Sequence, residues 1–544
     1  MSQHQFFRRS AVPAQVAQQL QTATIPAPTR GIVQSENEAF MQPGAAIVCD
    51  NWKPTMKGVS LRGGCALWAQ LPETTPVISA FEYVNGSNVH RMYAANAAKL
   101  YEVTTGTPVA VKTGQASGNY VASQMSNASG EHMLVANDAG DFLLHFDGTA
   151  WTTFDASQIT TDPAITPPPS CAIGKNLTYV CKYRGRYFFI EKNSMNAWYL
   201  GLNAIQGVLK MIPLSGAATK GGKLLFCASW SIDAGDGIDD KLVFCTDLGE
   251  LLIFTGSDPS VATSWRQEGR YDISPPLGMN AHLLVGGELL IATVDGIVPV
   301  SGAITKGRTE LELAAITRNI RLMWREQVAD KREHPWTMFK WDEYGGIFTA
   351  LPGGSPGNHL CLVTNSATGA HARFTGWDAM CFMHLREDAF FGTQTGQIMQ
   401  MDRTGTDDGV PYVATLVGGW EMFQSPSQTV TWRQARASFS ARPNEPFIPQ
   451  LSATTDYVVT IPQPPPAGVD PGPLDLWDEG LWDDAIWDAG VPPAKTVTNT
   501  GWVSIGMTGF SHAPIVQVTV AQAVRPEVDL INIAATYERD AIVV

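Results

Sequence analysis

The sequence predicts an all-β protein with a β-propeller-like domain of short hairpin repeats, a C-terminal β-sandwich and one amphipathic helix. Two observations favour this class. Fifty glycines and 35 prolines are interleaved with Val, Ile, Thr and aromatic residues, which is typical of many short strands joined by turns. One style of hairpin also recurs along the chain, and this repetition favours a propeller over the weaker alternative of two β-sandwiches.

The repeated unit is an apolar run, a turn with Asp or Asn and Gly, and a second apolar run. It occurs around Gly140, Gly249, Gly296 and Gly396, for example as LVFCTDLGELLIFTG. Turns of this composition between apolar runs are the strongest short-range hairpin signal. Their irregular spacing leaves the number of blades open.

Changes in composition divide the chain into three parts. Residues 1–40 are polar, with little periodicity, and are expected to form an N-terminal arm. Residues 41–427 hold the hairpins and form the predicted propeller-like domain. Residues 428–544 form the predicted sandwich, interrupted at about 461–495 by a Pro-rich and Trp-Asp excursion. A loop of that length inside a compact domain is usually functional.

One segment, Thr309–His334, has the spacing of apolar residues typical of a helix, with acids early and bases late. It predicts one amphipathic helix at about 309–330, with Thr309 as N-cap and Pro335 as the stop. Three arginines are expected to form a solvated or subunit-facing side: Arg318, Arg321 and Arg325.

Composition narrows the function classes. Hydrophobic residues make up 44% and charged residues 16%, which indicates a folded globular protein. The net charge is −14 and there is no run of Lys or Arg, so tight nucleic-acid binding is disfavoured, whereas an acidic channel wall that repels DNA fits the sign. We find no secretory signal and no apolar run of about 20 residues, so we expect cytosolic synthesis and no membrane span.

Catalytic and metal motifs are weak. The stretch GGSPG matches the Gly-x-Ser-x-Gly elbow, but Pro356 would follow the serine and has no N–H for an oxyanion hole. No pair of carboxylates is singled out for glycoside hydrolysis. Eight cysteines without a Cys-x-x-Cys pair and ten unpaired histidines favour buried free thiols and structural histidines. We therefore expect no enzyme activity, metal or cofactor.

The loop DAGDGIDD is acidic and glycine-rich, which makes it a candidate gate or contact loop. A mobile solvent loop is an equal alternative, and a Ca²⁺ site is a weaker one because the spacing departs from the EF-hand. The candidate residues are Asp233, Asp236, Asp239 and Asp240.

The stretch LDLWDEGLWDDAIWD repeats a Trp-Asp pair every five residues. Neither the helical period of 3.6 nor the strand period of 2 explains this spacing. It predicts an extended strap whose indoles are buried while the aspartates cap turns or stay in water. The groove that takes the indoles belongs equally well to the same chain or to a neighbouring subunit. The candidate contacts are Trp477, Asp478, Trp482, Asp483, Trp487 and Asp488.

Several stretches resemble one family. VCDNWKPTMKGVSLRGG, near residue 50, looks like the opening of the β-propeller tail proteins of short-tailed bacteriophages, with its Asp-Asn-aromatic and Leu-Arg-x-Gly texts. The segment 249–278, the text LLIATVDGIVPVSG, and the Trp-Asp stretch with the C-terminal text from GWVSIGMTGF to YERD are similar to further parts of that family. The patches extend from about residue 40 to the end of the chain.

The resemblance implies a structural virion protein, the tail nozzle or hub ring that gates and conducts DNA during ejection. It implies a homohexameric ring in the virion tail, assembled in the host cytoplasm. The implied partners are further copies of the chain, the tail adaptor or connector, tail fibres or spikes, and passing DNA that is not read by sequence. The alternatives are a propeller enzyme and a glycan-binding or partner-binding propeller.

Overall fold

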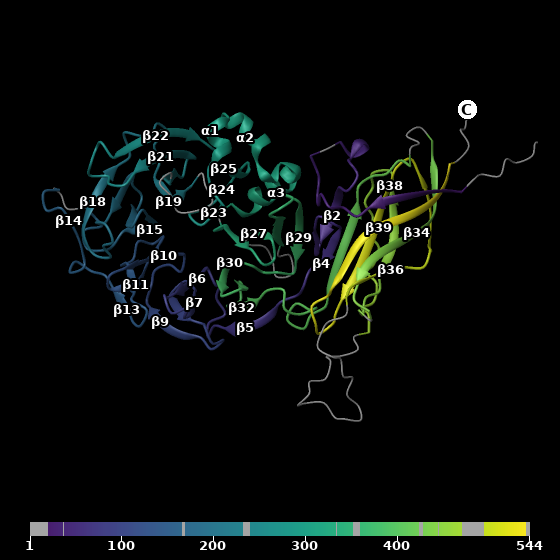
Figure 1. The fold of residues 1–544 in the computed structure, drawn as a ribbon, viewed down its shortest axis with the longest axis horizontal. Helices are drawn as coiled ribbons and strands as arrows, with labels where there is room; N and C mark the ends of the chain where they lie inside the picture. Colours follow the sequence, from purple (N-terminus) through teal and green to yellow (C-terminus); the bar gives the residue numbers. More distant parts are fainter. Residues whose placement is uncertain are drawn as a thin grey trace, which may run out of the picture.

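The computed structural model describes residues 20–35, 37–165, 169–231, 240–332, 334–351, 360–423, 428–443, 445–469 and 494–539. These residues form two bodies, a ring of β-sheets and a β-sandwich beside it (Figure 1). Strands dominate both, as the sequence predicts.

Seven sheets among the described residues radiate from one axis as the blades of a β-propeller. Each blade is an antiparallel meander whose first strand lies nearest the axis. The first blade consists of β6 (Ser79–Val84), β7 (His90–Ala95), β8 (Lys99–Glu102) and β9 (Val109–Thr113). The second consists of β10 (Tyr120–Asn127), β11 (Gly130–Asn137), β12 (Leu144–Phe146) and β13 (Trp151–Thr153). The third consists of β15 (Leu177–Tyr183), β16 (Arg186–Glu191), β17 (Asn196–Tyr199) and β18 (Gly207–Pro213), with β14 (Ile159–Thr161) parallel to β18.

The remaining blades continue in chain order. They are β19 (Leu224–Trp230), β20 (Lys241–Thr246), β21 (Glu250–Gly256), β22 (Trp265–Asp272); β23 (His282–Val285), β24 (Glu288–Thr293), β25 (Gly296–Pro299); β26 (Thr337–Trp341), β27 (Gly346–Leu351), β28 (Leu360–Asn365), β29 (His371–Thr375); and β30 (Cys381–Leu385), β31 (Asp388–Gly392), β32 (Gln397–Gln400). The four hairpins predicted from the sequence are β11–β12, β20–β21, β24–β25 and β31–β32.

A strand from the beginning of the chain closes the ring. The last blade is completed by β5 (Ala66–Gln70), which pairs antiparallel with β32, so that Ala69 lies opposite Ile398. Both residues are buried in one apolar cluster with side chains of the first blade, such as Met92. The two ends of the propeller are therefore held together by strand pairing and by a shared core.

The sandwich is built from both ends of the chain. Figure 1 shows the purple N-terminal strands among the green and yellow C-terminal ones. One sheet contains β1 (Gln21–Pro26), β3 (Trp52–Pro54), β4 (Val59–Leu61), β34 (Val430–Ala441), β36 (Thr496–Asn499), β37 (Val503–Gly509) and β39 (Val528–Arg539). The other contains β2 (Ala46–Asp50), β33 (Tyr412–Gly418), β35 (Gln450–Thr455) and β38 (His512–Val520).

The predicted domain boundaries are wrong at both ends. Strand β1 lies inside the predicted arm 1–40, and β2, β3, β4 and β33 lie inside the predicted propeller range 41–427, yet all five belong to the sandwich. The reason is that strands β1 and β4 pair with β39, near the other end of the chain. Pairing between distant segments leaves no local pattern in the sequence.

The predicted helix at 309–330 is present but interrupted. It consists of α2 (Arg308–Ala314), the 3-10 turn η2 (Ile316–Ile320) and α3 (Arg321–Lys331), preceded by α1 (Val300–Thr305). Ala315 between them has extended backbone angles, and α2 is capped by Gly307 instead of Thr309. The break lets Thr317 Oγ1 accept a hydrogen bond from the Ile297 N–H, 3.0 Å away on β25. A short 3-10 helix η1 (Glu38–Phe40) precedes β2.

None of the helices in the described part of the chain has the length and apolar character that a membrane span requires. The longest, α3, lies against the fifth blade, where the Trp324 indole donates to the Thr293 carbonyl at 3.0 Å. In Figure 1 the helices lie along the upper edge of the ring, with α3 nearest the sandwich.

We expect the closing strand pair to be a stability hot spot. Replacing Ile398, which is fully buried between β5 and the first blade, by Ala should lower the free energy of unfolding by about 2–5 kcal/mol through lost burial and an unfilled cavity. Urea denaturation of the full chain measures this. The matched control is Val109→Ala, which is 58% exposed on β9 and should change stability by less than about 0.5 kcal/mol. An equal effect of both changes would contradict the closure.

Candidate functional site

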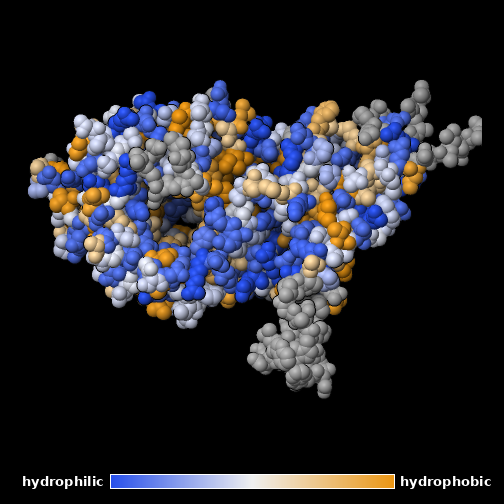
Figure 2. All heavy atoms as spheres, in the orientation of Figure 1, coloured by the Kyte–Doolittle hydropathy of each residue, from blue (hydrophilic) through white to orange (hydrophobic). Residues whose placement is uncertain are grey.

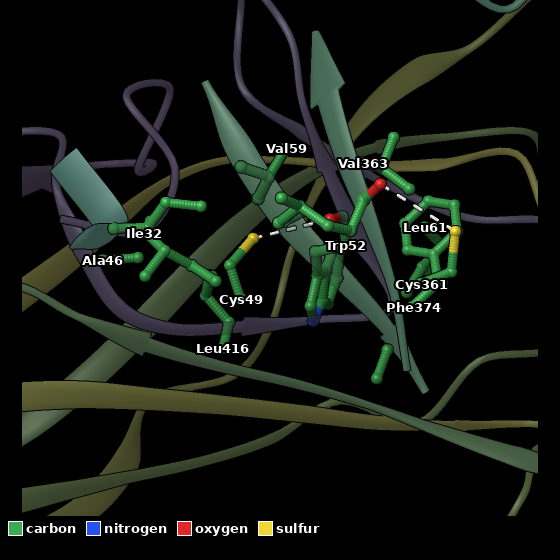
Figure 3. Close-up of a cluster of buried hydrophobic side chains, with 14 of the residues drawn as sticks. Ile32, Ala46, Cys49, Trp52, Val59, Leu61, Cys361, Val363, Phe374 and Leu416 are labelled. Atoms are coloured by element: carbon green, nitrogen blue, oxygen red, sulfur yellow. Dashed lines mark hydrogen bonds between the residues drawn. The ribbon is translucent and has the colours of Figure 1, made fainter. Parts of the chain in front are cut away.

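The junction between the sandwich and the propeller contains the residues that carry the sequence resemblance. Strand β2 joins the two bodies into one sheet, because it pairs antiparallel with β33 of the sandwich and parallel with β29 of a blade. Figure 3 shows the apolar part of this junction, where Trp52 lies between Leu416 of the sandwich and Cys361 and Phe374 of the blade, all in one buried cluster. The bodies therefore share a core.

An ion pair between a buried arginine and a partly buried aspartate lies at the centre of the junction. The Arg62 side chain has no exposed surface, and its two terminal nitrogens donate to the two carboxylate oxygens of Asp407 at 2.8 and 2.7 Å. Its Nε donates to the Asn51 side-chain oxygen at 2.8 Å. Paired, charge-assisted hydrogen bonds of this kind are the strong ones. Arg62 thereby links the chain that enters the propeller to the chain that leaves it.

Aromatic side chains surround the Arg62 guanidinium. Its central carbon lies 3.9 Å from the centre of the Tyr412 ring and 5.1 Å from that of Trp377. The Trp377 indole also donates to Asp407 at 3.1 Å. Burial by itself would lower the pKa of Arg62, but the hydrogen bonds and negative charge of Asp407 raise it. The Arg62 guanidinium is therefore charged.

The conformation and contacts of Asn51 explain why an asparagine stands in the Asp-Asn-aromatic stretch. It has φ of 62°, a left-handed conformation that Asn tolerates better than most residues. Its side-chain nitrogen donates to Thr375 Oγ1 at 2.8 Å and to the Val413 carbonyl at 2.7 Å, so that one amide connects blade and sandwich. The preceding Asp50 forms a bidentate pair with Arg373, at 2.6 and 2.7 Å.

The glycines after Arg62 allow the two connecting segments to run side by side. A Cβ on Gly64 would lie 1.9 Å from the Thr406 carbonyl oxygen, and one on Gly63 would lie 2.3 Å from Asp402 Oδ1. The Gly63 N–H donates to that same oxygen at 2.8 Å. Burial raises the pKa of Asp402, and Arg525, 2.8 Å away, opposes this shift. The glycines of the Leu-Arg-x-Gly stretch are therefore needed because the segments around residues 63 and 404 pack too closely for a side chain at either position.

A polar cavity of about 260 Å³ lies on the propeller axis, and Figure 2 shows a hollow in the middle of the ring. Six of the innermost strands contribute to its lining: β6, β10, β15, β23, β26 and β30. Its size is close to that of a small-molecule pocket.

The cavity offers hydrogen-bonding groups without charge. Tyr179 and His282 are joined through the hydroxyl and Nε2 at 3.0 Å, and the Asn280 amide donates to Asn119 at 3.0 Å. Burial lowers the pKa of His282 to about 4, so the imidazole is neutral near pH 7. Among the described residues that line the cavity there is no carboxylate, so the two-carboxylate arrangement of a glycosidase does not occur there.

The structure also describes no metal-binding group. In residues 20–539, apart from the gaps given above, no three or more His, Cys, Asp or Glu side chains gather in a way that could hold an ion. The eight cysteines are free thiols, seven of them buried and Cys181 half-buried.

The candidate gate loop is described only at its end. Asp233, Asp236 and Asp239 lie outside the described residues. Asp240 is described and is buried, which does not fit the mobile solvent loop that the sequence offered as an alternative. Its carbonyl accepts hydrogen bonds from the Tyr183 hydroxyl at 2.7 Å and from Arg184 at 3.1 Å, and these contacts hold the start of β20 against the neighbouring blade.

The Trp-Asp pairs lie outside the described residues. The candidate contacts on them are Trp477, Asp478, Trp482, Asp483, Trp487 and Asp488. The described ends of the predicted excursion 461–495 are both attached to the sandwich. The Pro465 carbonyl accepts from Thr519 at 2.5 Å on β38, and Lys495 forms ion pairs with Glu527 and Asp529 at 3.1 and 2.9 Å.

The described edge of the sandwich around β36 and β37 is apolar and exposed. Val497 is 64% exposed and Trp502 44% exposed, and all of β36 faces solvent. Exposed apolar residues commonly mark interaction surfaces. We call Val497 and Trp502 the sandwich edge. Val458 and Phe510 are also exposed, but they lie near the other end of β34, where Gly509 is opposite Val430.

Comparisons with known proteins give only weak likenesses. No family model and no curated protein matches the chain. Two extracellular domains of putative hybrid two-component systems from B. thetaiotaomicron are 12% and 9% identical, with TM-scores of 0.39 and 0.40. The alignments cover 67% and 74% of this chain, which spans about half of those domains, 44% and 54%. The Cps50 (Swd1) β-propeller domain of Myceliophteria thermophila is 11% identical with a TM-score of 0.36, over 62% of this chain and 99% of that domain.

Sequence reasoning missed several of these residues. Asp407 stands in the text TGTDDGVPY, which reads as an ordinary turn, and nothing local distinguishes it from Asp408. Tyr179 and His282 reach the axis from blades that are far apart in sequence. Each of these two residues lies on the first strand of its blade. Because first strands line the axis of a propeller, this position could have identified both as residues of the axial cavity.

Removing Arg62 should be strongly destabilising, because its fully buried site would be left empty and the partly buried Asp407 would lose its charged partner. We expect Arg62→Ala to lower the free energy of unfolding by about 3–5 kcal/mol, measured by urea denaturation. Arg433→Ala is the control, because that side chain is 50% exposed in its pair with Glu538 and should cost no more than about 1 kcal/mol. A loss of under 1 kcal/mol for Arg62→Ala would show that the ion pair does not hold the junction.

Stability should fall in acid because of buried histidines such as His371. Its Nε2 lies 3.1 Å from the Ile316 carbonyl and its Nδ1 lies 2.9 Å from Thr364 Oγ1, which fits the neutral ring. Burial lowers its pKa from 6.5 to about 4. Between pH 4 and 6.5 the His371 imidazole binds a proton in the unfolded chain but not in the folded chain. The free energy of unfolding is therefore highest above pH 6.5 and falls as the pH is lowered to 4, by up to about 3 kcal/mol.

The change that tests this is His371→Gln, which should make the dependence of unfolding free energy on pH shallower between pH 6.5 and 4. His334→Gln is the control, since His334 is exposed and should leave the slope unchanged. Equal slopes in wild type and His371→Gln would exclude this histidine as a source of acid sensitivity.

Proposed function

We propose that this chain is a structural virion protein that forms the tail nozzle or hub ring of a short-tailed bacteriophage. The observation that carries the proposal concerns the stretch VCDNWKPTMKGVSLRGG, which resembles the tail-protein family. Several of its residues contribute to one structural feature. Asp50, Asn51, Trp52, Arg62 and the glycines after it build the junction between propeller and sandwich. The resemblance therefore lies in residues that specify this two-body architecture.

The ring is a homohexamer in the proposal, attached to the tail adaptor and to tail fibres or spikes. Six copies would carry a formal charge of −84, six times the −14 of one chain. An acidic bore between the copies would let DNA pass without retaining it. The axial cavity of each propeller is small. We therefore propose that the DNA channel runs between the six copies and not through the axis of one propeller.

The sandwich edge is the surface that we assign to contacts between copies. Strand β36 is at the edge of its sheet, with one side unpaired among the described strands. An exposed edge with apolar side chains is a template for a further chain unless it is covered. In a ring, a neighbouring copy would provide that cover.

The second candidate is a glycan-binding tail component. It is favoured by the axial cavity, where Tyr120, Tyr179 and His282 offer aromatic rings and Ser79, Asn280 and Thr337 offer neutral polar groups. Such a lining suits hydroxyl-rich ligands. A propeller enzyme would need its catalytic carboxylates outside this cavity.

Light scattering and electron microscopy test the proposal. The purified full chain, alone and mixed with the tail adaptor, should give a mass of six copies and a closed ring, located at the tail tip in virions. Trp502→Ser combined with Val497→Ser should weaken the assembly by at least tenfold in half-dissociation concentration while the monomer stays folded. Val208→Ser, at a 51% exposed site on the propeller, is the matched control and should assemble normally.

A monomer that persists with the adaptor present and that binds or hydrolyses bacterial surface glycan would refute the nozzle and favour the second candidate. A basic lumen in the assembled ring would refute the acidic bore alone.

A further inference from the structure

Two thiols meet at the seam between neighbouring blades. Cys181 lies on β15 and Cys227 on β19, the innermost strands of the third and fourth blades, and their sulfur atoms are 2.9 Å apart. The two strands belong to different sheets, so only side chains join them at this point. Other cysteines contact carbonyl oxygens instead: Cys49 with Trp52, Cys361 with Thr349 and Cys381 with Val77.

The separation is close to that of a covalent bond. A disulfide has a sulfur–sulfur distance of about 2.0 Å, so the two atoms need to approach by roughly 0.9 Å. Both strands are held by their own ladders, with Cys181 opposite Phe188 and Cys227 opposite Phe244. The backbone therefore already presents the two side chains to each other.

The two thiols differ in access. Cys181 is half-buried, whereas Cys227 is fully buried. Burial and the adjacent Cys181 hold the pKa of the Cys227 thiol well above its ordinary value. A small oxidant therefore meets Cys181 first. The raised pKa makes Cys227 the slower thiol, and it takes part in the second exchange because its sulfur already lies 2.9 Å from that of Cys181.

We propose that Cys181 and Cys227 form a redox-modification site, which closes to a disulfide across the blade seam when the folded protein meets a small-molecule disulfide. The inference rests on this pair alone and is independent of the proposed function. In a reducing cytosol the thiols stay free, and an oxidising exterior supplies the oxidant.

The reaction proceeds in two exchanges. The Cys181 thiolate attacks one sulfur of oxidised glutathione, forming a mixed disulfide and releasing one glutathione thiolate. The Cys227 thiolate then attacks the Cys181 sulfur, forming the protein disulfide and releasing the second glutathione. Two protein thiols lose two electrons, glutathione disulfide gains them, and the two protons end on the released glutathione thiols.

The test is oxidation of the reduced full chain with glutathione disulfide, followed by mass spectrometry of the intact protein and of its unreduced peptides. Wild type should lose about 2 Da, the two thiol hydrogens of one disulfide, and yield a peptide cross-linked between Cys181 and Cys227. Its melting temperature should rise, because the cross-link restricts the unfolded chain. The rate should increase with pH, since the thiolate is the nucleophile.

Variants separate the two steps. Cys227→Ser should stop at a glutathione adduct on Cys181, and Cys181→Ser should give neither product. The matched control Cys245→Ser removes another fully buried thiol and should cross-link like wild type. Wild type that gains no cross-link while Cys227→Ser gains the adduct would overturn the proposal, as would the absence of the adduct from Cys227→Ser. Ring formation is read separately by light scattering, so failure of this proposal and failure of the nozzle proposal are distinguishable.

Discussion

The ion pair between the buried Arg62 and the partly buried Asp407 is the interaction on which the two-body architecture depends. The chain crosses from sandwich to propeller at 62–65 and returns at 401–411, and the pair ties the two crossings together. A charged group without exposed surface is costly unless it is fully partnered. Asp407, Asn51 and two backbone carbonyls, those of Gly63 and Thr375, supply that partnership. The position of each crossing is thereby fixed by one side chain.

The propeller is consequently an insertion in the sandwich. Its ring closes where β5 meets β32, immediately beside the crossings, so closure and junction are neighbouring parts of one structure. Strand β2 extends the same coupling through hydrogen bonds, since it makes a blade and a sandwich sheet continuous. With a shared apolar core as well, the two bodies are not free to move as independent domains.

The described groups with strongly shifted pKa values, such as His282 and His371, are shifted by burial and are hydrogen-bonded within the fold. Such shifts also occur at structural networks. Among the described residues, the polar axial cavity and the sandwich edge are both open to solvent.

The sequence by itself determined the strand-rich class and the four hairpins around Gly140, Gly249, Gly296 and Gly396, because a turn and its two flanking runs are local. It also located the helical segment, though not the extended Ala315 that interrupts it, since that break is imposed by packing of Thr317 on β25. Only the tertiary structure decided that β1 and β4 join β39, that β5 closes the last blade, and that Asp407 rather than Asp408 receives Arg62. Each of these pairs residues hundreds of positions apart, and a contact of that kind depends on which surfaces meet in space, not on the composition of either segment.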